Sequence, residues 1–304
     1  GFQNIVEFCQ EEIEDRLGLT IEIPVDKQDA DILVLHNAGE FLSWPENLQA
    51  FAVIFEQAGL SWTLSSEIAG YDSVNYGLFY DDVQLARVGL KHAEAAKKLN
   101  VRKVVMGECG HAHKAAMAIG DRVWLDQLNI PRESCFTLLA DLVRDGRIAF
   151  EPERNDFPVT LHDPCNVVRS MGIVQPQREV IRAACPGFRE MAPHGVENYC
   201  CGGGSGFAIM NSLNFLDWRM LIGGRKKFSQ ILASFDDEMH DLEKPKYVCA
   251  PCSNCKGQIR DLLAHYQAWD RCKLHYGGLV ELMVNAMKGV REGFIDWDEI
   301  DMMM

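Results

Sequence analysis

The stretch VCAPCSNCKG, residues 248–257, comes where an apolar run ends and a helical pattern begins. Its CxxC presents two thiols from one turn near a helix N-terminus, where the helix dipole lowers the pKa of a thiol. The earlier stretch VMGECGHA, residues 105–112, has the same order, with Cys109 in the place of Cys252. Ala112 stands where the second cysteine would be. We therefore expect a strand–turn–helix unit that occurs twice in the chain.

Further strands and helices alternate around these two stretches. Apolar runs and alternating patterns predict strands at residues 20–25, 30–36, 60–64 and 101–107. Helical spacing predicts helices at residues 4–18, 45–58 and 81–99 and another that begins at residue 110. Such alternation is typical of parallel sheets covered by helices, so the fold class we predict is α/β, with two pseudo-symmetric halves.

Matching residues support the repeat. LHNAG at residues 35–39 matches LHDPC at residues 161–165, so Gly39 stands where the second half has Cys165. The serine pair at residues 65–66 is a weaker match to the cysteine pair of the second half. The first half therefore lacks most of the cysteines that the second half has at the matching positions.

The charged stretch at residues 144–157 is the best boundary between the halves. We expect residues 1–150 to form a degenerate half without a metal cluster. Residues 151–304 would form the half that binds one.

Composition narrows the function classes. The chain has 304 residues and a net charge of -14, which disfavours nucleic acid as a partner. No apolar run approaches the roughly 20 residues that span a bilayer, and the stretch GFQNIVEF lacks the order of a signal peptide. Eleven cysteines in such a chain indicate ligands and free thiols rather than disulfides. We expect a reducing, cytoplasmic compartment.

Five cysteines form the candidate metal site: Cys165, Cys200, Cys201, Cys252 and Cys255. Glycines 202–204 follow the adjacent pair and permit the sharp turn that lets both thiols face one centre. Structural zinc closes at four ligands, so five thiolates favour an iron–sulfur cluster, with zinc as the alternative.

The pattern C-x34-CCG-x50-CxxC resembles the CCG domain of heterodisulfide reductase catalytic subunits and their relatives. The stretch GECGHAHKAA, residues 107–116, is similar to the DsrK branch of that family. The resemblance implies one non-cubane 4Fe-4S cluster on the five cysteines, which cleaves or forms a disulfide or trisulfide. The 50 residues between Cys201 and Cys252 are more than the family's usual spacing.

The resemblance also implies partners. The substrate would be a small cysteine-bearing protein such as DsrC, and a membrane cytochrome subunit would hold the chain peripherally on the inner face of the membrane. No CxxCxxCxxxCP run occurs in the sequence, so a ferredoxin-type cluster domain would lie upstream or on another subunit. Two alternatives stay open: a CCG electron-transfer subunit of a flavin-linked 2-hydroxy acid or glycerol phosphate dehydrogenase, and a non-catalytic scaffold with a structural metal site.

Cys109, Glu108 and His111 are the candidate catalytic residues. Cys109 occupies the counterpart of a ligand position at the carboxyl end of a strand, where open α/β sheets bind their ligands. His111 could supply protons to a departing thiolate, as could His113. A packed thiol is the alternative for Cys109, and a helix cap or surface position is the alternative for the histidines.

His162 and its repeat partner His36 follow strand ends in both halves. We expect a structural hydrogen bond from each, in preference to proton transfer. Four other cysteines, Cys9, Cys135, Cys185 and Cys272, are expected to be core or surface thiols, and Cys249 a buried strand thiol.

Overall fold

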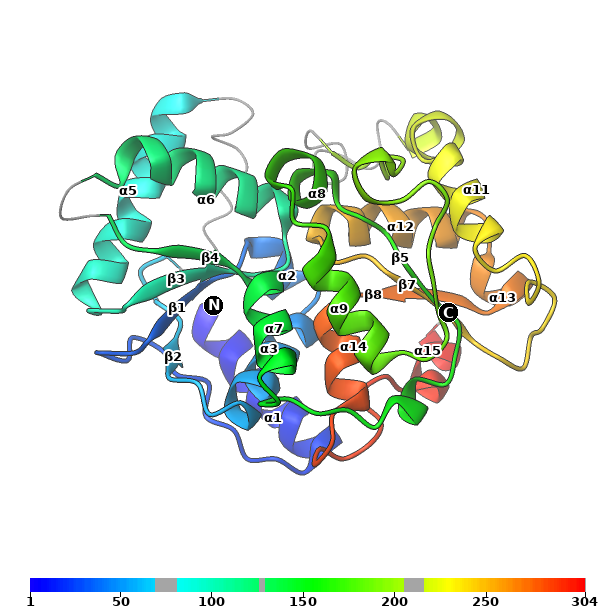
Figure 1. The fold of residues 1–304 in the computed structure, drawn as a ribbon, viewed down its shortest axis with the longest axis horizontal. Coiled ribbons are helices and arrows are strands. Elements are labelled where there is room, and N and C mark those ends of the chain that lie inside the picture. Colours follow the sequence, from blue (N-terminus) through cyan, green and yellow to red (C-terminus); the bar gives the residue numbers. More distant parts are fainter. Residues whose placement is uncertain (69–80, 126–128, 205–215, 304) are drawn as a thin grey trace. The chain divides into compact units, whose positions relative to one another are not determined.

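The computed structural model describes residues 1–68, 81–125, 129–204 and 216–303 (Figure 1). The chain divides into two compact units, Gly1–Ala149 and Phe150–Met304. Among the described residues, no helix combines the length and the apolar composition that crossing a bilayer requires.

The first unit is built on a parallel sheet with the strand order β2-β1-β3-β4. Its strands are β1 (Ile32–Leu35), β2 (Trp62–Thr63), β3 (Lys103–Met106) and β4 (Arg132–Ser134). Leu35 pairs with Met106, so the carboxyl ends of the two central strands meet at one edge of the sheet.

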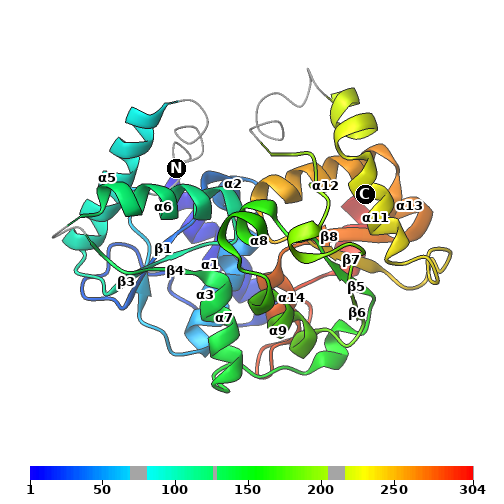
Figure 2. The same cartoon turned by 45° about the horizontal axis from the view of Figure 1, so that its top comes forward.

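Helices cover both faces of this sheet: α1 (Phe2–Leu17), α2 (Ala38–Leu42), α3 (Glu46–Gln57), α5 (Asp82–Lys98), α6 (Gly110–Val123) and α7 (Cys135–Arg144). Helices α5 and α6 lie on one face, and α1, α3 and α7 lie on the other (Figures 1 and 2). Alternate strand residues such as Leu33 and Val104 pack in one core cluster with Ala93 and Ala96 of α5. Helix α5 is capped by Asp81, whose carboxylate accepts from two backbone N–H groups.

The second unit repeats this architecture with the order β6-β5-β7-β8, again all parallel. Its strands are β5 (Val159–Leu161), β6 (Phe188–Arg189), β7 (Lys246–Cys249) and β8 (Leu274–Gly277). In each unit the first strand is central and pairs with both the second and the third. The predicted α/β class with two parallel sheets is therefore confirmed.

Helix α12 lies on one face of the second sheet, and α9 and α14 lie on the other (Figure 2). The helices of this unit are α8 (Cys165–Met171), α9 (Gln175–Ala184), α11 (Arg225–Ala233), α12 (Ser253–His265), α13 (Ala268–Cys272), α14 (Leu279–Ala286) and α15 (Trp297–Met303). Shorter turns are the 3-10 helices η2 (Pro152–Asn155) and η3 (Gly195–Glu197) and the π-helical η4 (Arg219–Gly223).

The strand predicted at residues 20–25 is wrong. This segment forms a single bridge, between Val25 and Leu64. Pro24 has no N–H to donate to a ladder, and the N–H of Ile23 bonds to the side chain of Gln10 at 2.8 Å. The alternating pattern reflects the burial of Ile21 and Ile23 beside the sheet rather than strand pairing.

Candidate cysteine-rich metal site

The five candidate ligands come from three segments of the second unit. Cys165 begins α8 shortly after β5, and Cys252 is the N-cap of α12 shortly after β7. Strands β5 and β7 are neighbours, with Leu161 paired to Cys249, so both segments leave the sheet at the same edge. Cys200 and Cys201 follow η3.

The structure brings these thiols together in a continuous chain of contacts. The Sγ atoms of Cys201 and Cys255 are 3.4 Å apart. Cys200 hydrogen bonds with Cys165 and with Cys201, and Cys255 with Cys252. Each of the five sulfurs therefore contacts another member of the set, as one shared centre requires.

The glycine turn that follows the cysteine pair aims backbone donors at the sulfurs. The N–H of Gly202 points to Sγ of Cys200, and the N–H of Gly203 points to Sγ of Cys201, each at 3.4 Å. Gly202 has φ +87°, and a Cβ at this position would lie 2.6 Å from the carbonyl oxygen of Gly223. Only glycine fits this turn. The two N–H groups stabilise negative charge on the sulfurs.

Because the five thiols lie close together, each shifts the pKa of its neighbours. The pKa of Cys200 is far below its ordinary value because the thiols of Cys165 and Cys201 donate hydrogen bonds to it. Contact with Cys200 and then burial raise the pKa of Cys201 to about 12, and the same causes raise that of Cys165. Contact with Cys201 and Cys252 raises the pKa of Cys255. A bound cation would stabilise the thiolate form of the protonated thiols, which would lose their protons on binding it.

The five thiols differ in their exposure to solvent. Cys201, Cys252 and Cys255 are buried, Cys165 is half-buried and Cys200 is exposed. Cys200 is therefore the most accessible of the five thiols.

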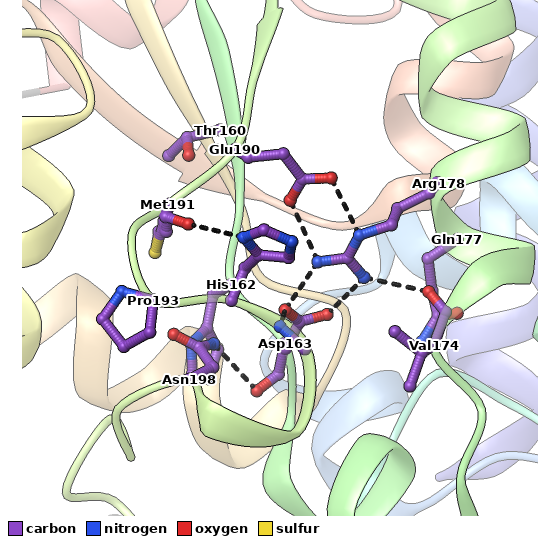
Figure 3. Close-up of polar contacts among 12 residues, drawn as sticks. Thr160, His162, Asp163, Val174, Gln177, Arg178, Glu190, Met191, Pro193 and Asn198 are labelled. Carbon is purple, nitrogen blue, oxygen red and sulfur yellow. Dashed lines mark hydrogen bonds and ion pairs between the residues drawn. The ribbon is translucent and has the colours of Figure 1, made fainter.

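A polar network supports the segments that carry the cysteines (Figure 3). Both oxygens of Asp163 accept from Arg178, at 2.8 and 2.7 Å, and Arg178 also donates to both oxygens of Glu190. Asp163 accepts in addition from the N–H of Gly195 at 2.6 Å. The network thus joins the segment before Cys165 to the one before the cysteine pair.

A second chain of hydrogen bonds leads from Lys227 to His162. Lys227 is fully buried and donates to the side-chain oxygen of Asn198 at 2.7 Å. Burial lowers the pKa of Lys227 to about 8, although the nearby thiolates of Cys201 and Cys255 oppose this. The amide of Asn198 lies 3.4 Å from Nδ1 of His162, so His162 makes a structural hydrogen bond, but as its acceptor and not as the donor that we expected.

Our sequence reasoning missed Lys227, Asn198 and Arg178. The one available signal concerned Lys227, which lies four residues before Ile231 and so falls on the buried face of α11. Asn198 and Arg178 carry no local signal, because their roles arise only when distant segments meet.

The candidate catalytic residues lie in the first unit at the carboxyl end of β3. Cys109 is the N-cap of α6, as Cys252 is of α12, and each follows its strand by the same number of residues. The side-chain amide of Asn37 donates to Sγ of Cys109 at 3.1 Å. Glu108 accepts from Asn47 at 2.9 Å, and His111 is buried. Their catalytic use stays a prediction.

His113 and His36 are held inside the first unit. The ring nitrogens of His113 lie 3.0 Å from the carbonyl oxygen of Cys109 and 2.9 Å from Oγ of Ser134, so this histidine has a structural role. Neither ring nitrogen of His36 has a hydrogen-bond partner among the residues that the structure describes, so the structural hydrogen bond predicted for it is wrong. Its Nδ1 lies 3.7 Å from Glu40, and its ring packs edge-on against Phe41 and Phe51.

Glu40 joins the ends of the two central strands in the first unit. Its buried carboxylate accepts from the N–H of Asn37 at 2.7 Å, beyond β1, and from the N–H of Cys109 at 2.9 Å, beyond β3. A side chain thus joins the strand ends that a metal centre would join in the second unit. The proposed match of Ser65-Ser66 to the cysteine pair has no such support, because β2 ends two residues before Ser65 and β6 ends eleven before Cys200.

The remaining cysteines are free and buried: Cys9, Cys135, Cys185, Cys249 and Cys272. Burial raises the pKa of Cys9 and of Cys185 to about 12. These are inert core thiols, and Cys249 lies within β7 as expected.

The fold and the site define a class: a parallel α/β protein of two units, one of which gathers five thiols at the carboxyl edge of its sheet. Residues 159–260, which contain all five cysteines, match the cysteine-rich domain family named CCG. The second unit therefore contains a CCG domain, and the chain is similar to heterodisulfide reductase-like subunits.

Curated relatives agree. The Hdr-like menaquinol oxidoreductase iron-sulfur subunit 2 of Archaeoglobus fulgidus is 24% identical over 94% of this chain and 56% of its own length. The corresponding iron-sulfur subunit of Archaeoglobus profundus is 25% identical over 68% of this chain and 44% of its own length. A dihydromethanophenazine:CoB–CoM heterodisulfide reductase subunit of Methanosarcina mazei is 32% identical over 41% of this chain and 30% of its own length. The chain spans about half the length of the two Archaeoglobus relatives.

Proposed function

We propose that this chain is the redox catalytic part of a heterodisulfide reductase-like oxidoreductase. It would hold one non-cubane 4Fe-4S cluster on Cys165, Cys200, Cys201, Cys252 and Cys255. The observation that carries the proposal is the convergence of five thiols from three segments at one sheet edge. Five soft ligands exceed the four of structural zinc and suit iron and sulfide. The names of the Archaeoglobus relatives, which are iron-sulfur subunits, support the same cofactor.

The reaction we propose is the cleavage, or the reverse formation, of a sulfur–sulfur bond. Cleavage of RS–SR′ consumes two electrons and two protons and yields RSH and R′SH. When bound, the cluster would supply electrons singly together with iron that has affinity for sulfur. The protein's own groups would hold the charge: the N–H groups of Gly202 and Gly203 and the buried cation of Lys227 stabilise negative sulfur.

Cys109, Glu108 and His111 would act on the substrate. A thiol at a helix N-cap, with Asn37 donating to its sulfur, is suited to engage a substrate sulfur. His111 would hand a proton to the departing thiolate, and Glu108 would tune the proton supply.

The substrate and partners we propose follow from the resemblance to the DsrK branch. A small DsrC-like protein would present a cysteine-bearing arm to the site. Electrons would pass through a ferredoxin-type cluster domain and a membrane cytochrome subunit, with the chain peripheral on the cytoplasmic face of the membrane.

Iron and acid-labile sulfide analysis of anaerobically purified chain, with electron paramagnetic resonance, tests the proposal. We expect about four irons and a matching amount of sulfide per chain. Replacing any one of the five cysteines by serine should alter the spectrum, because each supplies a ligand. Cys9→Ser and Cys272→Ser are matched controls, because both remove a buried thiol outside the site.

One zinc per chain without labile sulfide would contradict the proposal and favour a scaffold with a structural metal. A loaded cluster that exchanges electrons with a flavin subunit, but never turns over a disulfide-bearing protein, would favour the electron-transfer alternative.

A further inference from the structure

His162 is a buried imidazole at the edge of the five-cysteine site. It follows β5 directly and is 1% exposed. One of its ring nitrogens lies within 4.8 Å of the Sγ atoms of both Cys201 and Cys255. The ring therefore belongs to the immediate surroundings of the thiols.

Neighbouring groups fix which ring nitrogen carries the hydrogen. The ammonium of Lys227 only donates, so the atom of Asn198 that it contacts at 2.7 Å is the amide oxygen. The other atom of this amide is then NH₂, in agreement with its contact of 3.2 Å to the carbonyl oxygen of Asp163. The same NH₂ lies 3.4 Å from Nδ1 of His162. Nδ1 is thus the acceptor, and Nε2 carries the hydrogen in the neutral ring.

The Nε2–H of His162 has no hydrogen-bond partner, sulfur included, within residues 1–68, 81–125, 129–204 and 216–303. A buried N–H group without a partner is costly, and such groups in proteins call for an explanation. The sulfurs of Cys201 and Cys255 are acceptors that lie within 4.8 Å of a nitrogen of this ring, so a small shift of the thiols on binding a metal centre would bring one of them into hydrogen-bond distance.

We infer that His162 is a positioning residue whose Nε2–H donates a hydrogen bond to a sulfur of the five-cysteine site and thereby raises the reduction potential of the centre. The inference rests on the proposed function, because it assumes an iron–sulfur cluster on these cysteines. A hydrogen bond to sulfur withdraws electron density and favours the reduced state, which carries more negative charge. Lys227 orients the amide of Asn198, and this amide donates to Nδ1, which keeps the hydrogen of the ring on Nε2.

Three substitutions at residue 162 separate the donor from the ring. In His162→Gln the amide nitrogen can reach the place of Nε2, so the hydrogen bond to sulfur is retained. In His162→Asn the shorter amide reaches only the place of Nδ1, and in His162→Phe the ring has no donor. His36→Phe is the matched control, because His36 is the repeat counterpart of His162 in the unit that lacks the site.

The experiment is a redox titration of anaerobic, cluster-loaded chain followed by electron paramagnetic resonance, with iron and sulfide measured for every variant. At a fixed poise near the wild-type midpoint, we expect the ratio of reduced to oxidised cluster to fall about tenfold in His162→Phe and His162→Asn. A tenfold change corresponds to about 59 mV for a one-electron couple. His162→Gln and His36→Phe should keep the wild-type midpoint. Electron–nuclear double resonance in H₂O and D₂O should show an exchangeable proton coupling that only the two donor-less variants lose.

Several outcomes decide the matter. An unchanged midpoint in His162→Phe and His162→Asn, with full cluster content, overturns the inference. Strong ¹⁵N coupling from labelled histidine also overturns it, because that would show direct coordination to iron. Loss of the cluster in both donor-less variants but not in His162→Gln still assigns the requirement to the donor. If the wild-type chain binds no iron–sulfur cluster, the proposed function itself has failed, which is a different result.

Discussion

Replacing Arg178 by methionine should destabilise the second unit strongly, because Arg178 is the counter-charge of a buried carboxylate. The side chains of Arg178 and Asp163 are 2% and 0% exposed and are joined by two hydrogen bonds, at 2.8 and 2.7 Å. Removing one member of such a pair leaves the other charge buried and costs about 3–5 kcal/mol. Methionine keeps most of the volume of the arginine side chain. The loss of stability therefore measures the contribution of the charge and its hydrogen bonds.

Arg182→Met is the matched control. Arg182 is on the same helix and contacts the same Glu190, at 3.2 Å, but its side chain is 56% exposed. An exposed ion pair contributes at most about 1 kcal/mol. The free energy of unfolding would be measured by anaerobic urea titration, with hydrogen exchange of peptides from β5 and residues 188–200 to locate the loss. If Arg178→Met costs no more than Arg182→Met, the reasoning is refuted.

The pH dependence of the free energy of unfolding tests the role of Arg178 independently. Burial alone would raise the pKa of Asp163, but hydrogen bonds from Arg178 and the N–H of Gly195 hold it below its ordinary value. The stabilisation from this depressed pKa is fully present above about pH 3.9 and is lost as the pH falls through the pKa of the folded state. In Arg178→Met the buried carboxyl loses the guanidinium, so its pKa should rise. The difference in stability between wild type and variant should therefore shrink as the pH is lowered from 7 toward 5.

Three further predictions concern the site. Cys109→Ala should keep iron content and fold but slow turnover of a disulfide-bearing partner by roughly 100-fold, the typical loss of a positioned catalytic group, and unchanged turnover would return Cys109 to a packing role. The chain should bind about four irons, because one cluster has that number, and a content near eight with a second magnetic signal would show that the first unit also binds a cluster. Gly202→Ala should lower the iron content, because the added Cβ would meet the backbone of Gly223. Gly146→Ala is the control: its backbone has a similar φ of +70°, but the space around it is open, so the iron content should stay unchanged.

Much of the fold could be predicted because its signals are local. The helix predicted at residues 81–99 is α5, with Asp81 as its cap, and the strand predicted at residues 101–107 contains β3. The match of Cys109 to Cys252 also rested on local order, and both residues proved to be N-caps after equivalent strands. Ile21 and Ile23 misled us because alternation reports burial on one side, and only a partner strand converts it into a ladder.

The surroundings of the site could not be predicted in the same way. Asp163 stands beside His162 in the sequence, but its partners Arg178 and Gly195 are 15 and 32 residues away. The tautomer of His162 depends on Lys227, 65 residues further along the chain. Such contacts depend on the order of the strands and the lengths of the connections, which periodicity does not encode.

The carboxylate of Glu40 has a consequence for how the cell matures this chain. The two units share one architecture but differ in their need for iron. The first unit needs none to join its strand ends, because the side chain of Glu40 joins them. The second gathers thiols that repel one another once ionised, so with the proposed cluster its full stability would depend on the bound cofactor. We therefore expect that iron starvation leaves the first unit fully folded and the second unit less stable.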